Sequence, residues 1–168
     1  MAREIADLIK YKQSKKQKCI LGLATGSSPI TVYDELINIH EKEKLSFKNV
    51  VTFNLDEYYP ISSDNSESYH TFMYENLFNH IDIDGDNINI PRGDLKKNEI
   101  EKYCNDFEEK IKKLGGIDYQ LLGIGRTGHI GFNEPGSSSN SVTRLVKLDY
   151  LTRDCLLYTS PSPRDISW

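Results

Sequence analysis

The feature that most constrains the fold is a series of short apolar runs, each followed by a polar loop and then by an amphipathic stretch. Residues 19–24 and 50–55 are largely apolar without alternation, which is typical of strands buried on both faces. A third run, residues 118–124, leads into a glycine-rich segment. The expected helices are residues 2–12, the stretch that follows Pro29, residues 66–80 and residues 99–114.

Strand, loop and helix in repetition predict the α/β class, here a Rossmann-like three-layer fold with a mainly parallel sheet. Residues 88–91 predict a further short extended piece. The alternation of residues 142–148 predicts a fourth strand that is exposed on one face.

Composition narrows the class of protein. A chain of 168 residues with 38% hydrophobic and 27% charged residues is long enough for one soluble domain with its own core. Its net charge of -4 weighs against nucleic acid as a partner. No apolar run reaches membrane-spanning length, and the N-terminus lacks a signal-peptide core. Cys19, Cys104 and Cys155 are odd in number and lack metal-ligand spacing, which predicts a reducing cytoplasm and no disulfide framework.

Three polar loops follow the expected strands, at residues 25–29, 56–60 and 125–135. In open parallel sheets, ligands bind beyond the carboxyl ends of the strands. We therefore expect these loops to converge on one ligand site.

The first loop offers an anion site or a helix cap. Thr25, Gly26 and Ser27 precede Pro29, which suits the first turn of a helix. Backbone N–H groups, hydroxyls and the helix dipole at such a position favour a phosphate group. The alternative is a helix cap without a ligand.

The second and third loops carry the acid/base candidates. Asp56 and Glu57 follow a buried strand, where a carboxylate can act as a general base, bind a metal or close a turn. Glu57 is expected to point away from Asp56 and to be structural. His129 lies among glycines, five residues before Glu134, and this pair predicts a general acid/base.

A metal site is not expected. His40, His70 and His80 lie on expected helices without ligand spacing. The tyrosines of the same region, Tyr58, Tyr59, Tyr69 and Tyr74, are expected to be packing aromatics.

The C-terminal segment changes character abruptly. Residues 155–165 resemble, in one reading frame, the translation of a transposon-based sequencing adapter. We therefore expect residues 1–154 to be a partial native domain and residues 155–168 to be a non-native tail. The alternative is a Ser/Pro-rich linker.

Several segments together resemble the glucosamine-6-phosphate deaminase family, within the deaminase/6-phosphogluconolactonase superfamily. The matching pieces are residues 21–29, the run Ser46 to Tyr58 with Phe-Asn-Leu-Asp-Glu-Tyr, residues 67–69, and residues 123–138 with Gly-His-Ile-Gly-Phe-Asn-Glu-Pro. The resemblance implies conversion of glucosamine 6-phosphate and water to fructose 6-phosphate and ammonia, an isomerase and hydrolase step in amino-sugar catabolism, without a redox cofactor.

The resemblance also implies residue roles. Asp56 is the base that takes the C2 proton, and His129 opens the sugar ring with Glu134 as its partner. Thr127 stands where many members carry Asp or Asn, so it offers a hydroxyl instead of a charge. Thr25, Gly26, Ser27 and Gly125 are implied in substrate binding, and Ser137 and Arg144 align with an allosteric site. At residue 146, a valine replaces the expected allosteric lysine.

Family members continue past residue 154 and begin earlier than Met1. The sheet is therefore expected to be incomplete at both ends, and this fragment to show little activity, because the sugar-phosphate clamp of later residues has no counterpart. Some members of the family are homo-oligomers, and the parent of this fragment is expected to be one as well. A lactonase-like hydrolase and a non-catalytic sugar-phosphate sensor are the alternative functions. A deaminase releases ammonia from its substrate, whereas neither of these two alternatives does.

Overall fold

The computed structural model describes residues 1–125 and 128–148. Thr127 and the expected non-native tail, residues 155–168, therefore lie outside the described residues, as do residues 149–154.

Within the described residues, four parallel strands form one sheet in the order β3-β2-β1-β4. β1 (Cys19–Leu23) pairs with β2 (Val50–Asn54) along its whole length, and every residue of both strands is buried. β3 (Ile88–Asn89) and β4 (Tyr119–Gln120) pair on the outer sides through two residues each. The parallel α/β fold expected from the apolar runs is confirmed.

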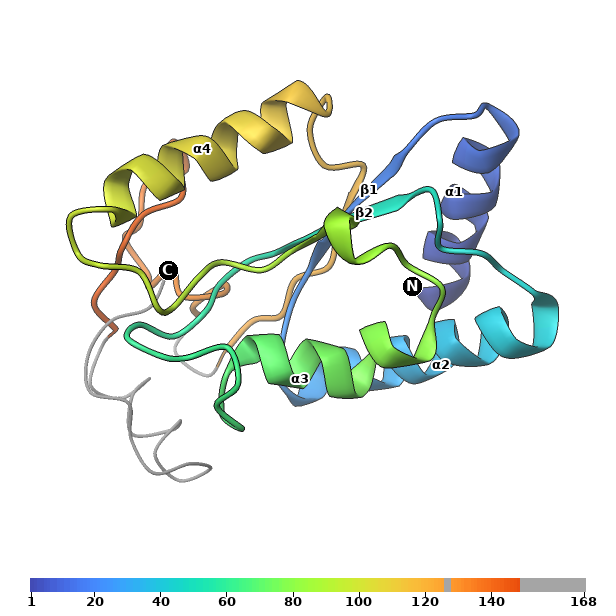
Figure 1. Ribbon diagram of the computed structural model, residues 1–168, viewed down its shortest axis with the longest axis horizontal. Helices are drawn as coiled ribbons and strands as arrows, with labels where there is room; N and C mark the ends of the chain where they lie inside the picture. The colour runs from blue at the N-terminus through green and yellow to red at the C-terminus, as the bar shows by residue number, and fades with distance from the viewer. Residues whose placement is uncertain (126–127, 149–168) are drawn as a thin grey trace.

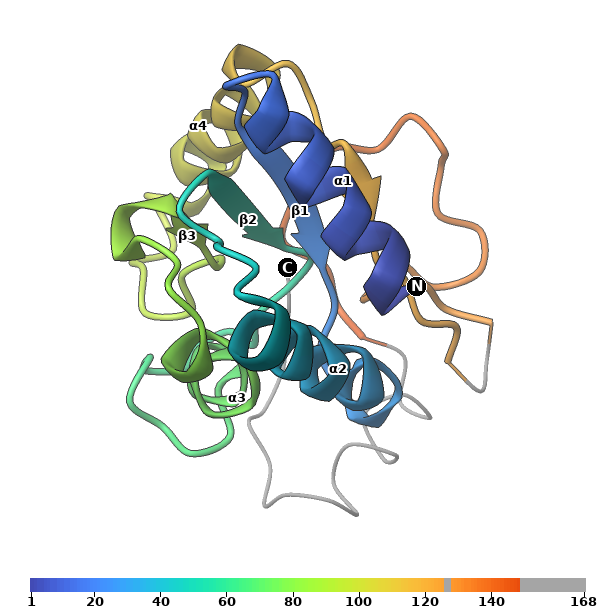
Figure 2. The same ribbon diagram turned by 90° about the vertical axis from the view of Figure 1, so that its right-hand side faces the viewer.

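Helices cover both faces of this sheet. α4 lies on one side, α2 and α3 lie on the other (Figure 1), and α1 runs beside α2 (Figure 2). The helices are α1 (Ala2–Ser14), α2 (Ser27–Glu43), α3 (Tyr69–Asn76) and α4 (Ile100–Lys113), and the 3-10 turns are Phe78–His80 and Gly85–Asn87.

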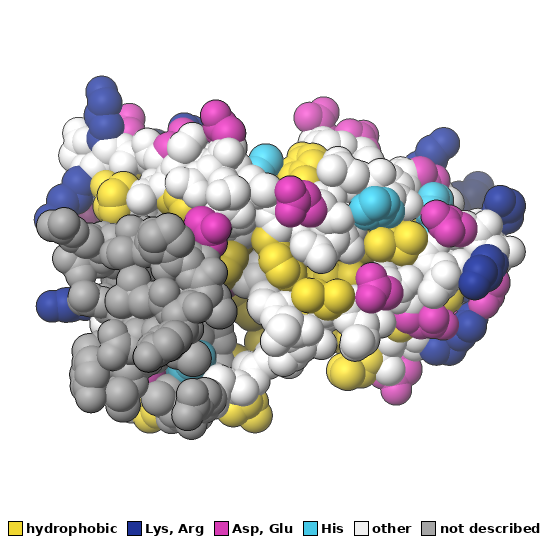
Figure 3. All heavy atoms as spheres, turned by 90° about the horizontal axis from the view of Figure 1, so that it is seen from below, with side chains coloured by type: hydrophobic (Ala, Val, Ile, Leu, Met, Phe, Trp, Pro, Cys, Tyr) yellow, Lys and Arg dark blue, Asp and Glu magenta, His cyan; other side chains and the backbone are white. Residues whose placement is uncertain are grey.

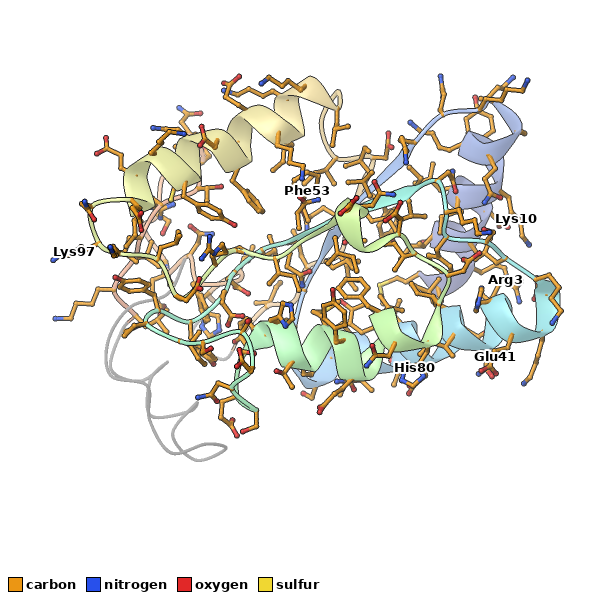
Figure 4. All side chains as sticks on the ribbon, viewed as in Figure 1. Arg3, Lys10, Glu41, Phe53, His80 and Lys97 are labelled. Carbon is orange, nitrogen blue, oxygen red and sulfur yellow. The ribbon has the colours of Figure 1, made fainter. Side chains whose placement is uncertain are left out.

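Each central strand contributes to two cores because its side chains alternate between the faces. Phe53 points between the sheet and α4 (Figure 4), where its ring meets that of Phe107 edge-on at 5.4 Å between centroids. Leu21 and Leu23 face the other way, into the core with α1 and α2. Cys19 is buried there as expected, and burial raises the pKa of its thiol to about 12.

Two expected elements are shorter than the sequence pattern predicted. The helix expected over residues 66–80 begins at Tyr69, because the Ser68 side chain accepts the N–H of Thr71 and caps it. The third strand, expected over residues 118–124, is reduced to Tyr119–Gln120.

The prediction of a strand over residues 142–148 is wrong. This stretch has only an isolated bridge position at Val146. Thr143 instead donates its N–H and its hydroxyl to Glu108 of α4, and Leu145 packs against Ile100 and Cys104. The alternation of polar and apolar residues therefore reflects an extended segment lying on a helix, which needs no partner strand.

No helix among the described residues is long and apolar enough to cross a membrane. Figure 3 shows acidic and basic side chains interspersed toward the end of the molecule farther from the undescribed segment.

Candidate active site

The loops that follow β1, β2 and β4 meet at one pocket of about 290 Å³, beyond the carboxyl ends of the strands. Parallel strands end at the same edge of the sheet, which brings together loops that lie far apart in sequence. Six residues selected from the sequence line this pocket: Thr25, Gly26, Ser27, Asp56, Gly125 and His129.

The loop after β1 passes directly into α2. Gly26 has φ +92°, a left-handed conformation that favours glycine, and it immediately precedes the first helical residue. The Tyr33 hydroxyl donates to the carbonyl of Ala24 and so fixes the start of the loop. The pocket is therefore bordered by the N-terminus of α2, where the helix dipole favours a negative group.

Asp56 is the acid most altered by its surroundings. Its side chain is 5% exposed. Burial, with the nearby charge of Glu57 as a second cause, raises the pKa of Asp56 to about 7. A carboxyl group with such a pKa can both accept and release a proton near neutral pH.

The third loop closes directly on this carboxyl group. Gly131 has φ +57°, and a Cβ atom on it would lie 3.0 Å from Asp56 Oδ2. The loops after β2 and β4 therefore touch at the Asp56 carboxyl group.

Glu57 has the structural position expected for it. Its carboxylate accepts backbone N–H groups from Tyr58 at 2.8 Å and from Tyr69 and His70 at 2.9 Å each. Burial raises the pKa of Glu57 against the opposing effect of these three hydrogen bonds. Glu57 thus holds the first turn of α3 against the Asp56 loop.

The remaining residues selected from the sequence lie elsewhere. Glu134 is half-buried beyond the turn that carries His129, and it does not line the pocket. Ser137 and Arg144 line a second hollow, of about 390 Å³. The second hollow shares Leu55, Gly131 and Phe132 with the first. Thr127 lies outside the described residues.

Sequence reasoning missed two aromatic walls of the pocket, Tyr69 and Phe132. Their rings stack at 5.7 Å between centroids and 21° between planes. The Tyr69 hydroxyl donates to the Tyr58 hydroxyl at 3.0 Å and shares a hydrogen bond with Thr25. Burial, followed by the charge of Asp56, raises the pKa of Tyr69 well above its ordinary value. The only available signal was that Tyr69 and Phe132 both lie in matched segments, since aromatic character alone indicates packing.

The described residues contain no group of three His, Cys, Asp or Glu side chains that could hold a metal ion. Asp56 and His129 line the same pocket, and a carboxyl group and an imidazole can exchange protons with a polar ligand.

The fold and the pocket define an α/β protein with a small-molecule site at the carboxyl edge of a parallel sheet. The chain belongs to the family of glucosamine-6-phosphate isomerases/6-phosphogluconolactonase, whose model matches residues 1–144.

Relatives in this family are close. The chain is 51% identical over 152 residues to a glucosamine-6-phosphate deaminase of Clostridium botulinum (strain Langeland / NCTC 10281 / Type F), covering 90% of this chain and 62% of the relative. It therefore spans about three fifths of the length of the curated relatives it matches.

Solved structures agree with the observed architecture. A monomeric glucosamine-6-phosphate deaminase of the NagB superfamily superposes with a TM-score of 0.90 at 44% identity, covering 99% of this chain and 68% of that one. A 6-phosphogluconolactonase from Thermotoga maritima, at TM-score 0.69 and 22% identity, covers 99% of this chain and 71% of its own and shows the shared fold alone.

Proposed function

We propose that the whole protein converts glucosamine 6-phosphate and water to fructose 6-phosphate and ammonia. The observation that carries this proposal is a buried carboxyl group, Asp56, with a pKa of about 7 in the same pocket as His129. Relatives named glucosamine-6-phosphate deaminase support the choice of substrate.

In the proposed mechanism, His129 moves the proton that opens the sugar ring, and Glu134 assists it from beyond the turn, five residues further along the chain. Asp56 then takes the proton from C2 of the open-chain amino sugar and returns it to C1. Water adds to the resulting imine at C2, and ammonia leaves. A carboxylate suits proton abstraction next to an imine-like centre, and a positioned imidazole is the commonest general acid/base for moving a hydroxyl proton.

The reaction requires no redox cofactor. Carbon C1 is reduced from aldehyde to alcohol while C2 is oxidised from amine to ketone, so electrons balance within the substrate. We therefore propose that the protein uses no cofactor.

Substrate binding is proposed at the N-terminus of α2. Thr25, Gly26 and Ser27 line the pocket where the helix dipole favours an anion. An amino-sugar phosphate offers both the anion and the hydroxyls that this loop can bind.

The setting of the whole protein is part of the same proposal. We propose a small sugar phosphate as its partner, without nucleic acid or membrane, and action in the cytoplasm. We also propose homo-oligomeric assembly and an allosteric role for Ser137 and Arg144, although one solved relative is named as monomeric. Sedimentation velocity of the whole protein, with and without N-acetylglucosamine 6-phosphate, tests assembly and regulation together.

The test of function is an assay of the whole protein from its full reading frame. Glucosamine 6-phosphate should yield ammonia and fructose 6-phosphate in equal amounts, and Asp56→Asn should lower kcat by roughly 100-fold or more, as removal of a general base does. Acid production from 6-phosphogluconolactone without ammonia release would favour the lactonase. Sugar-phosphate binding that survives Asp56→Asn, with no turnover by the wild type, would favour a sensor.

A further inference from the structure

The position of the His129 ring depends on the absence of a side chain at Gly125. A Cβ atom on Gly125 would overlap the imidazole ring, with Nε2, Cε1 and Cδ2 as its nearest neighbours. The ring therefore lies directly over the Cα atom of Gly125, and both residues line the pocket.

Backbone contacts hold the two residues opposite each other. The N–H of Gly125 donates to the carbonyl of His129 at 2.8 Å, and the N–H of Gly128 donates to the carbonyl of Gly125 at 2.9 Å. Ile124 and Ile130 form an antiparallel bridge on either side of the pair. Gly125 and His129 therefore lie opposite each other, and the imidazole lies against the Gly125 backbone.

Backbone conformation does not explain glycine at this position. Gly128 and Gly131 have φ values of +83° and +57°, where a side chain is strained, whereas Gly125 lies outside that region. The remaining requirement at Gly125 is space, either for a ligand or for the His129 ring.

We infer that Gly125 is a positioning residue for His129, and that its hydrogen side chain leaves the space in which the imidazole lies. The catalytic meaning of this placement rests on the proposed function, but the placement itself does not. Gly125 was expected to contact the substrate. In the structure the space beside its Cα atom is occupied by the His129 ring.

If the inference holds, Gly125→Ala should displace the His129 ring and have little effect on the fold. The added methyl group would force the imidazole to rotate about its side-chain torsions, because the overlapping atoms belong to a side chain that can move. Gly125 lies outside the helices and the strands of the sheet, so far-UV circular dichroism should be unchanged.

Gly123→Ala is the matched control. Gly123 lines the same pocket, its φ also lies outside the left-handed region, and a Cβ atom on it would meet nothing within 4 Å. A substitution there adds the same methyl group without touching the His129 ring.

The experiment is NMR of this chain with its four histidine rings resolved and the His129 ring signals assigned through His129→Gln. In the wild type, nuclear Overhauser effects should join the His129 ring protons to the Gly125 Hα protons. In Gly125→Ala these effects should be lost and the His129 ring signals should shift several-fold more than in Gly123→Ala. Equal shifts in the two variants, or no contact in the folded wild type, would overturn the inference.

If Gly125→Ala does not fold, adding His129→Ala should restore folding, and a double variant that also fails to fold would contradict the inference. If Gly125→Ala folds, a double-mutant cycle gives a second test. In a His129→Ala background the ring is gone, so Gly125→Ala should cost less stability than it does in the wild type. An equal loss of stability in both backgrounds would show that the added methyl group does not collide with the His129 ring. A whole protein that releases no ammonia, with the ring contact intact, would refute the proposed function and leave the placement of His129 unchanged.

Discussion

Asp56 is an acid that would be fully ionised at neutral pH in water, and burial changes this. Its pKa in the folded chain is about 7, against an ordinary value of 3.8, with burial as the larger cause and the charge of Glu57 as the second. The folded chain therefore binds this proton more tightly than the unfolded chain does. The associated stability is fully present below about pH 3.8 and is lost as the pH rises through about 7.

Asp56→Asn should therefore stabilise the chain at high pH. The gain should grow from pH 4 to pH 7 and then level off at roughly 4 kcal/mol, because each pKa unit between 3.8 and about 7 is worth about 1.4 kcal/mol. Urea unfolding at pH 4, 6 and 8 measures it. Asp64→Asn is the control, because hydrogen bonds from Ser62 and Ser63 lower the pKa of that exposed carboxyl. A gain in unfolding free energy that is independent of pH would contradict the raised pKa of Asp56.

The same pKa predicts the pH dependence of catalysis. If Asp56 is the base that takes the C2 proton, it must be ionised in the free enzyme. The kcat/KM of the whole protein should therefore rise with pH and reach a plateau above a midpoint near 7. A profile already level at pH 5 would exclude Asp56 as that base.

Among the elements, α3 depends most on one side chain outside it. Glu57 accepts the N–H groups of Tyr69 and His70 at the start of the helix, and Ser68 accepts that of Thr71. Carboxylate and hydroxyl together satisfy N–H groups that have no partner within the helix. This capping also places the ring of Tyr69 in the wall of the pocket.

Glu57→Ala should cost about 2–4 kcal/mol of unfolding free energy, because it leaves buried N–H groups without an acceptor. Ser68→Ala, the control at the same helix end, should cost about 1 kcal/mol. Guanidinium unfolding of both variants gives the comparison. A smaller loss for Glu57→Ala than for Ser68→Ala would show that the carboxylate does not hold α3.

The central strands could be predicted from sequence with nearly their observed bounds, whereas the outer strands were expected at the right places but too long. β1 and β2 are buried on both faces, so their apolar residues are continuous and identify them. Residues 142–148 alternate like a strand in the sequence, but Leu145 packs on α4 and Thr143 binds Glu108 of the same helix. Local periodicity reports which side is buried, and it does not distinguish burial by a helix from burial by a sheet.

The site divides in the same way. Asp56 and His129 could be selected because glycine and carboxylate patterns after strands carry chemical information of their own. Tyr69 could not, because its place in the pocket depends on Glu57, twelve residues earlier. The space that Gly125 provides for His129 is likewise a property of the folded turn.

Over the whole molecule, exposed apolar side chains gather after β4. Leu122, Ile124, Ile130 and Val142 are 50%, 78%, 40% and 55% exposed. Ile124 and Ile130 are neighbours across a bridge, and Ile130 and Val142 line the same hollow. Contiguous exposed apolar surface favours association with other apolar surfaces.

This chain should therefore bind a hydrophobic dye and self-associate in a concentration-dependent way. The double variant Ile124→Ser/Val142→Ser should lower dye fluorescence several-fold and shift sedimentation toward the monomer. Tyr11→Ser, at a residue 58% exposed on α1, should change neither. Equal effects of the two substitutions would show that this cluster is not the cause.

The central claim is that the loops after β2 and β4 meet at a buried carboxyl group that exchanges its proton near neutral pH. Carbon-13 NMR titration of the Asp56 carboxyl, followed together with the amide signal of Gly131, tests this directly. We predict one midpoint near pH 7 for both signals, because Gly131 lies against Asp56 Oδ2. A carboxyl midpoint near 4, or a Gly131 amide that does not respond, would contradict the account.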